Sequence, residues 1–181
     1  MSLLRALVLS VLFVSSLALA QLDTGDKLIE ESLLALPEHM RDGATVAYFD
    51  EDKRVVLREG SNGITCQPDD PDTPGFAVWC YPQSHAAYTK RWYELAAEGR
   101  ERAEVDEMIT AEIEDNKLEW PAVAVNYNLR GPSLDTAVPL TVVYVPFSTG
   151  ESIGVTEERQ FNRPWLMLAG TAFAHIMIPG Q

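Results

Sequence analysis

The order of helix-prone and strand-prone segments constrains the fold of this chain most strongly. Residues 84–115 are rich in helix formers, whereas strand-prone runs lie before them, at 44–57, and after them, at 122–178. A parallel α/β fold needs strands and helices that alternate regularly, and this alternation is missing. We therefore predict an α+β domain with a mainly antiparallel sheet, on which the helices from the middle of the chain pack.

Capping residues, proline and glycine mark the predicted ends of the helices. Asp23 or Thr24 can cap a helix over residues 25–36, which Pro37 closes. Gly99 divides residues 84–115 into two helices, because glycine inside a helix costs about 1 kcal/mol.

The strand-prone runs are short. Residues 44–49 and 55–57 flank a polar connection of hairpin length, which predicts an antiparallel hairpin. Residues 122–127, 140–145 and 174–178 predict three further strands.

One segment contains many turn formers. Residues 67–82 carry Pro68, Pro71, Pro74 and Pro82, a density that predicts a loop without regular structure.

The first twenty residues have the pattern of a secretory signal peptide. Arg5 precedes the apolar run 6–14, and residues 18–20 read Ala-Leu-Ala, so we expect cleavage between Ala20 and Gln21. A membrane anchor would need roughly 18 consecutive apolar residues, and serines interrupt this run. We predict a single globular domain over residues 21–181, secreted or periplasmic, which is not an integral membrane protein after cleavage.

Cys66 and Cys80 are the only cysteines. In an exported protein they predict a structural disulfide that ties the two ends of the proline-rich loop. A redox pair would have the spacing C-x-x-C, and a zinc site would need two further ligands nearby. Neither pattern is present, and nothing in the sequence indicates a cofactor.

The chain is acidic. It carries 14 Lys and Arg against 27 Asp and Glu, a net charge of −13. Binding to nucleic acid depends on basic side chains that neutralise phosphates, so this balance disfavours nucleic acid as a partner.

One motif offers a possible catalytic site. Residues 150–154 match G-x-S-x-G, and Ser152, Glu157 or Glu158, and His175 follow in the order nucleophile, acid, base. This motif has meaning only between a strand and a helix of a parallel sheet, which the chain does not predict. We therefore expect a turn at Ser152, and at His175 a half-buried histidine with a backbone partner.

Two other groups of residues have both a structural and a functional interpretation. Asp69, Asp70 and Asp72 offer oxygen ligands for a weak cation site, although aspartate and proline are also good turn formers. Tyr88 and Trp92, with the adjacent Tyr93, have helical spacing. This spacing predicts core packing, and exposed rings there would suit a binding face.

Two segments resemble an uncharacterised family of small secreted bacterial proteins of unknown function. They are the N-G-x-T-C-x-P-D segment, residues 62–69, and the P-W-x-M-x-x-G-T-x-x-A-H segment, residues 164–175. The resemblance implies export from a bacterium and no specific activity. It also suggests that the cysteine segment and the C-terminal strand share one structural core.

These features favour an exported, non-catalytic binding or interaction domain whose ligand the sequence does not identify. The alternative is a small exported serine hydrolase that uses Ser152 and His175.

Overall fold

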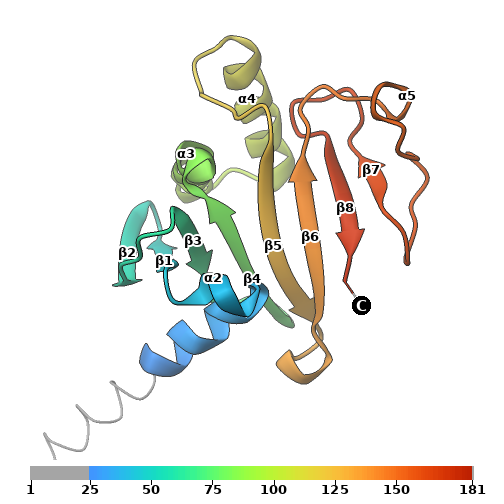
Figure 1. Ribbon diagram of the computed structural model, residues 1–181. Helices are drawn as coiled ribbons and strands as arrows, with labels where there is room; N and C mark the ends of the chain where they lie inside the picture. Colours follow the sequence, from blue (N-terminus) through green and yellow to red (C-terminus); the bar gives the residue numbers. More distant parts are fainter. Residues whose placement is uncertain (1–24, 181) are drawn as a thin grey trace, which may run out of the picture.

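The computed structural model describes residues 25–180, and its centre is one eight-stranded sheet in the order β2-β1-β3-β4-β5-β6-β8-β7 (Figure 1). All neighbouring strands are antiparallel except β1 and β3, which are parallel. The strands are β1 (Thr45–Asp50), β2 (Lys53–Arg58), β3 (Ile64–Gln67), β4 (Phe76–Pro82), β5 (Ala124–Gly131), β6 (Val138–Tyr144), β7 (Trp165–Met167) and β8 (His175–Pro179). The predicted α+β class with a mainly antiparallel sheet is confirmed.

The predicted hairpin is formed by β1 and β2, which pair from Asp50 opposite Lys53 to Val46 opposite Arg58. The chain then returns to place β3 beside β1. This return passes very close to the start of β1, since a Cβ atom on Gly60 would lie 2.3 Å from the carbonyl carbon of Ala44. Only glycine fits this close approach of two backbones.

The prediction that residues 67–82 form an irregular loop is wrong. Phe76–Pro82 is a regular strand, β4, which pairs with β3. The turn-forming prolines are confined to residues 68–74, and Pro82 is the last residue of the strand, where a missing N–H costs little.

The Cys66–Cys80 disulfide is confirmed, with an S–S distance of 2.05 Å. The two cysteines lie directly opposite each other on β3 and β4. The bridge therefore joins two neighbouring strands, and the turn 68–75 lies beyond it.

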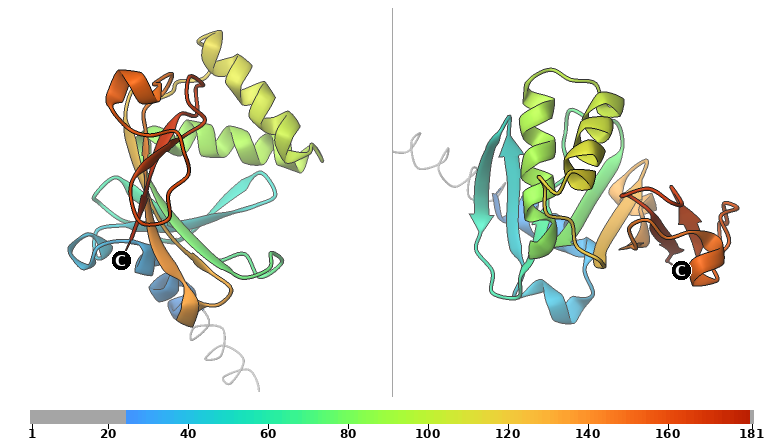
Figure 2. Two further views of the ribbon diagram at one scale, coloured as in Figure 1. Left: turned by 90° about the vertical axis from the view of Figure 1, so that its right-hand side faces the viewer. Right: turned by 90° about the horizontal axis from the view of Figure 1, so that it is seen from above.

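The middle of the chain forms the two predicted helices, α3 (Ala86–Ala97) and α4 (Arg102–Glu114), separated at Gly99, whose φ is +79°. Both lie on the same side of the sheet (Figure 2). Leu95 on α3 packs against Val105, Ile109 and Ile113 on α4 in one buried apolar cluster.

The opposite face of the sheet is covered by the N-terminal helical segment. Residues 25–32 are α-helical and continue as a 3₁₀ turn, η1 (Leu33–Ala35), as the predicted helix 25–36 requires. Leu33 and Leu36 pack against Val78 and the disulfide. Because side chains alternate along a strand, Trp79 on β4 faces the other side, toward α3. Four short helical elements complete the fold: α2 (Glu38–Arg41), η2 (Gln83–His85), η3 (Leu134–Thr136) and α5 (Gly150–Ile153).

The three predicted strands after the helices are confirmed as β5, β6 and β8, whereas the three-residue strand β7 was not predicted. The suggested common core of the cysteine segment and the C-terminal strand needs correction. Cys66 on β3 and His175 on β8 belong to one sheet, but β4, β5 and β6 lie between them. Cys66 packs in the cluster under the N-terminal segment, which does not include β8.

The predicted signal peptide, its cleavage point and the helix cap at residues 23–24 lie outside the described residues. Among the residues that the structure describes, no helix is both long enough and apolar enough to cross a membrane.

Candidate functional site

Ser152 and Glu157, the candidate nucleophile and acid, both stabilise the short helix α5. The Ser152 hydroxyl donates to the carbonyl oxygen of Thr149 at 2.8 Å and accepts from the Thr149 N–H at 3.0 Å. The Glu157 carboxylate accepts from the N–H of Gly150 at 2.7 Å. The G-x-S-x-G segment is thus a capped single turn, as the turn interpretation expected.

His175 lies on β8, directly opposite Tyr144 on β6. Its Nδ1 atom is 2.7 Å from the carbonyl oxygen of Phe173, which confirms the expected backbone partner. Burial lowers the pKa of His175, and this hydrogen bond partly opposes the lowering. Over residues 25–180, no hydrogen bond links His175 to Ser152.

The three candidate metal ligands lie in the turn between β3 and β4. Asp69 accepts a hydrogen bond from the N–H of Ala77 at 2.7 Å, and Asp70 accepts one from the N–H of Asp72 at 3.0 Å. No group of three or more acidic, histidine or cysteine side chains in the described part of the chain is arranged to hold a metal ion. Asp69 and Asp70 therefore serve the turn, as aspartates commonly do.

Chemically diverse side chains instead converge in a cavity of about 450 Å³ on the side of the sheet that carries α3. This volume lies within the range of small-molecule sites. Two larger hollows have less specific linings: one lies between loops at Pro121 and Phe147, and the other carries charges of both signs, including Arg54 and Glu59.

The floor of the cavity is a row of polar side chains on β5. Asn126, Asn128 and Arg130 occupy alternate positions, so they share one face of the strand. The Asn128 amide donates to the carbonyl oxygen of Leu140 at 3.3 Å. Asn126 is only 4% exposed, and its Oδ1 atom has no hydrogen-bond partner within the described residues. An unpaired buried amide oxygen costs free energy, so this group needs a partner.

Aromatic side chains form the walls. Tyr88, Trp92 and Tyr93 reach the cavity from α3, and Trp79 and Tyr144 reach it from the sheet. The predicted core packing of the three α3 rings is only part of their role. All three are half-buried, so they pack at the helix–sheet interface and also present surface to the cavity.

The lining is cationic although the chain is acidic. It contains two arginines, Arg102 and Arg130, and no Asp or Glu, whereas the lowered pKa of His175 favours the neutral form of that ring. Loss of water around Arg130 lowers the pKa of its guanidinium, and the positive charge of Arg102 lowers it further. Burial raises the pKa of the Tyr144 hydroxyl, so this side chain stays neutral and can donate a hydrogen bond.

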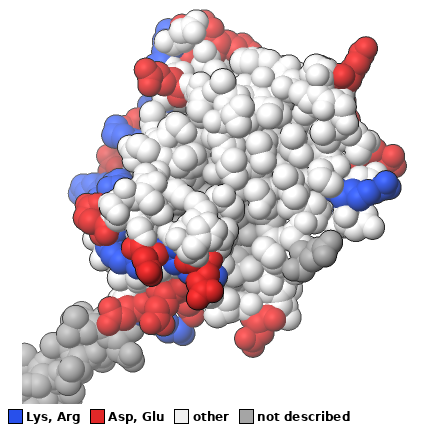
Figure 3. Space-filling model, in the orientation of Figure 1, with Lys and Arg blue, Asp and Glu red and all other residues white. Residues whose placement is uncertain are grey.

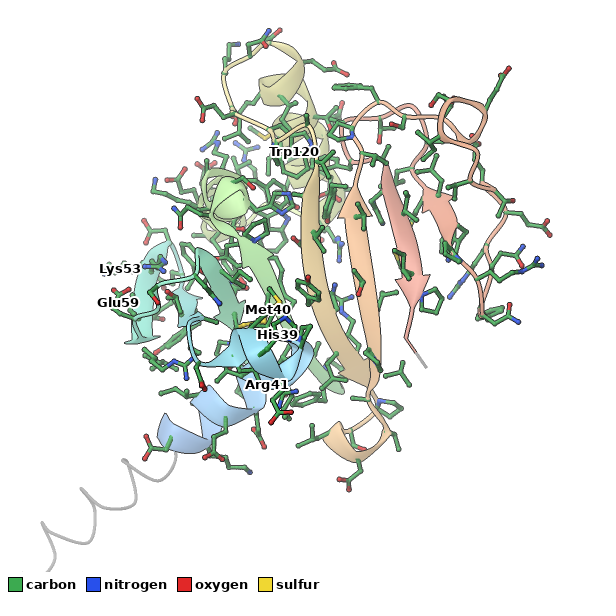
Figure 4. The ribbon with its side chains drawn as sticks, viewed as in Figure 1. His39, Met40, Arg41, Lys53, Glu59 and Trp120 are labelled. Carbon is green, nitrogen blue, oxygen red and sulfur yellow. A yellow bond between two sulfur atoms is a disulfide. The ribbon has the colours of Figure 1, made fainter. Side chains whose placement is uncertain are left out.

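A buried histidine lies beside Asn126. His85 is fully buried, and its ring stacks on Trp120 at 4.7 Å and meets the edge of Tyr144 at 4.8 Å. Figure 4 shows Trp120 at the end of the sheet that α4 covers. Burial lowers the pKa of His85 to about 4, whereas the nearby Asn126 side chain acts in the opposite direction. Neither ring nitrogen forms a hydrogen bond with any described residue.

The polar row on β5 and the buried position of His85 were not predicted from the sequence. Residues 125–130 do alternate between apolar and polar side chains, but this pattern normally indicates a strand with one face in water. Helices from another part of the chain cover this face, and the residues of β5 themselves give no indication that it is covered.

Comparison with known proteins gives no functional guide: no protein-family model matches the chain, and no similar protein is found among curated proteins or solved structures.

Proposed function

We propose that this protein is an exported, non-catalytic binding protein that holds a small organic molecule in the cavity between the sheet and α3. The observation that carries the proposal is the polar row of Asn126, Asn128 and Arg130 at the floor of a cavity with aromatic walls. Pockets for small molecules combine these features, since apolar walls supply most of the contact and a few polar groups set orientation.

Binding explains the lining better than catalysis does. The walls offer flat aromatic surface, and the floor offers fixed amide groups on a strand, which suit a ligand with a planar or apolar body. The candidate catalytic residue Ser152 is not among the residues that line this cavity, and His175 is held by a backbone carbonyl.

Export fits this function. The signal-peptide pattern of residues 1–20 and the acidic composition support a secreted or periplasmic protein. A buried disulfide is typical of oxidising compartments outside the cytoplasm.

A neutral fluorescent probe tests the cavity. We expect N-phenyl-1-naphthylamine to increase in fluorescence when it binds the folded protein. Leu140→Trp should weaken binding about tenfold, because the larger side chain fills the cavity that Leu140 lines. Val56→Trp is the matched control, since Val56 lies on β2 at the far edge of the sheet, is exposed and does not line the cavity.

Melting curves of both variants establish that they are folded before binding is compared. Equal binding by Leu140→Trp and the native protein, or no binding by the folded native protein, would overturn the proposal.

A further inference from the structure

We propose that the ligand is an organic anion and that Arg130 binds its acidic group, with Arg102 beside it at the rim of the cavity. This inference rests on the proposed function, because it names the chemical class of the ligand for the same cavity. An acidic group here means a carboxylate, sulfonate or phosphate, each of which a guanidinium recognises through paired N–H donors.

The position of Arg130 leaves its guanidinium available. Its cross-strand neighbours are Ala77 on β4 and Val138 on β6, and neither offers an acceptor in its side chain. Within residues 25–180, Arg130 forms no ion pair. By contrast, Arg91 on α3 pairs with Glu112 at 2.7 Å.

A second cation stands near the first. Burial is the main cause of the lowered pKa of Arg130, and the charge of Arg102 lowers it further, so the two guanidinium groups repel each other. The nearest carboxylate to Arg102 in an ion pair is Asp106, at 3.8 Å, and the Arg102 side chain remains 85% exposed. An anion placed between the two arginines relieves their repulsion, which is a stabilisation that a neutral ligand does not provide.

The overall charge makes this local arrangement informative. A net charge of −13 repels anions in general, but in physiological salt this repulsion is screened beyond about 8 Å. Only charges close to the lining then decide the charge that the cavity accepts. Two arginines are part of the lining, and the carboxylate that acts on Tyr88 and Tyr144, Asp106, lies outside it beside Arg102.

The polar row on β5 offers further polar groups to the ligand, deeper in the cavity than Arg130. Asn128 lies between Arg130 and Asn126 on one face of the strand. A ligand whose acidic group meets Arg130 therefore lies over Asn128 and points toward Asn126 at the inner end of the row. The aromatic rings from α3 cover the apolar body between these two polar ends.

The test compares two related probes, the anionic 8-anilinonaphthalene-1-sulfonate and the neutral N-phenyl-1-naphthylamine. In Arg130→Met we expect the Kd of the sulfonate to rise about tenfold, while the Kd of the neutral probe changes by less than about twofold. Added salt should weaken only the sulfonate. Arg54→Met is the control, since it removes the same charge from β2, at the far edge of the sheet.

The outcomes separate the two proposals. If the neutral probe binds but Arg130→Met leaves the sulfonate unchanged, the anion assignment is wrong and the binding function stands. If neither probe binds the folded protein, both proposals fail. Because the sulfonate also binds partly unfolded states, unchanged near-ultraviolet circular dichroism must accompany each titration.

Discussion

His85 shows at the scale of one residue how this fold handles a polar side chain. It is enclosed by Trp120, Tyr144 and Tyr88, and both ring nitrogens lack a hydrogen bond to any described residue. Stacking on a neutral ring is favourable, whereas a charged imidazolium in this enclosure would lose its water, and the nearby Asn126 side chain offsets only part of that cost. The neutral form is therefore strongly preferred in the folded state.

This preference predicts how stability depends on pH. The pKa of His85 is about 4 in the folded protein and near 6.5 when exposed, so between these values the unfolded chain binds more protons. The free energy of unfolding should therefore fall as the pH drops through this window, by about 3 kcal/mol in total. Urea unfolding at several pH values measures it.

His85→Phe keeps the stacked ring and removes the titrating group, so it should lose this part of the fall. His175→Phe is the matched control. It should retain the part of the fall in unfolding free energy that His85 contributes. If His85→Phe and the native protein lose stability in parallel from about pH 6.5 to about pH 4, His85 is not the responsible group.

Ser152 gives a second test at this scale, which separates the binding proposal from the hydrolase alternative. Its hydroxyl donates to Thr149, and no histidine contacts it among the described residues, so no base activates it. We expect a fluorophosphonate probe to leave the folded protein unlabelled. Labelling that disappears in Ser152→Ala would instead establish a serine nucleophile.

At the scale of elements, the disulfide fixes the pairing of β3 and β4. Cys66 and Cys80 are both fully buried, 14 residues apart, in the apolar cluster under the N-terminal segment. The bridge thus restricts the unfolded chain and also contributes to the core.

Removal of this bridge should be costly. We expect Cys66→Ala/Cys80→Ala to lower the free energy of unfolding by about 3 kcal/mol, because a closed loop of this length removes about that much chain entropy. Denaturant unfolding measures the loss. The native protein, unfolded and refolded under a reducing agent, is the control and should lose stability similarly; a loss below about 1 kcal/mol in both would contradict this account.

Sequence patterns predicted most elements here because their signals are local. Gly99 ended a helix through its own backbone preference, and the polar turn after β1 set a hairpin. The strand Phe76–Pro82 was missed for a different reason. The prolines before it dominate the composition of the segment and indicate a loop. The strand itself is stabilised by pairing with β3 and β5, and the residues of β4 alone do not report that pairing.

For the whole molecule, charge is distributed unevenly. Figure 3 shows acidic and basic side chains gathered around the margins of one face, with a broad uncharged surface between them. The cavity lies on the other side of the sheet, beside α3, and its own cations contrast with the acidic total. The net charge of the chain therefore does not describe the charge that lines the cavity.

The predicted processing can be tested on the full chain. Expressed with its own first twenty residues in a bacterium, the protein should be recovered outside the cytoplasm, with a mass that corresponds to residues 21–181 and one disulfide. A Val8→Arg variant, which places a charge within the apolar run, should stay in the cytoplasm unprocessed. Export of that variant, or an uncleaved native chain, would contradict the prediction.

The sequence by itself determined the α+β class, the division into two central helices and the cysteine pair, because each depends on periodicity, backbone preference or redox chemistry that a short segment carries. Only the tertiary structure decided that Asn126, Asn128 and Arg130 form the floor of a cavity. Whether a strand face meets water or another element depends on which distant helix covers it, and here α3 covers the polar face of β5.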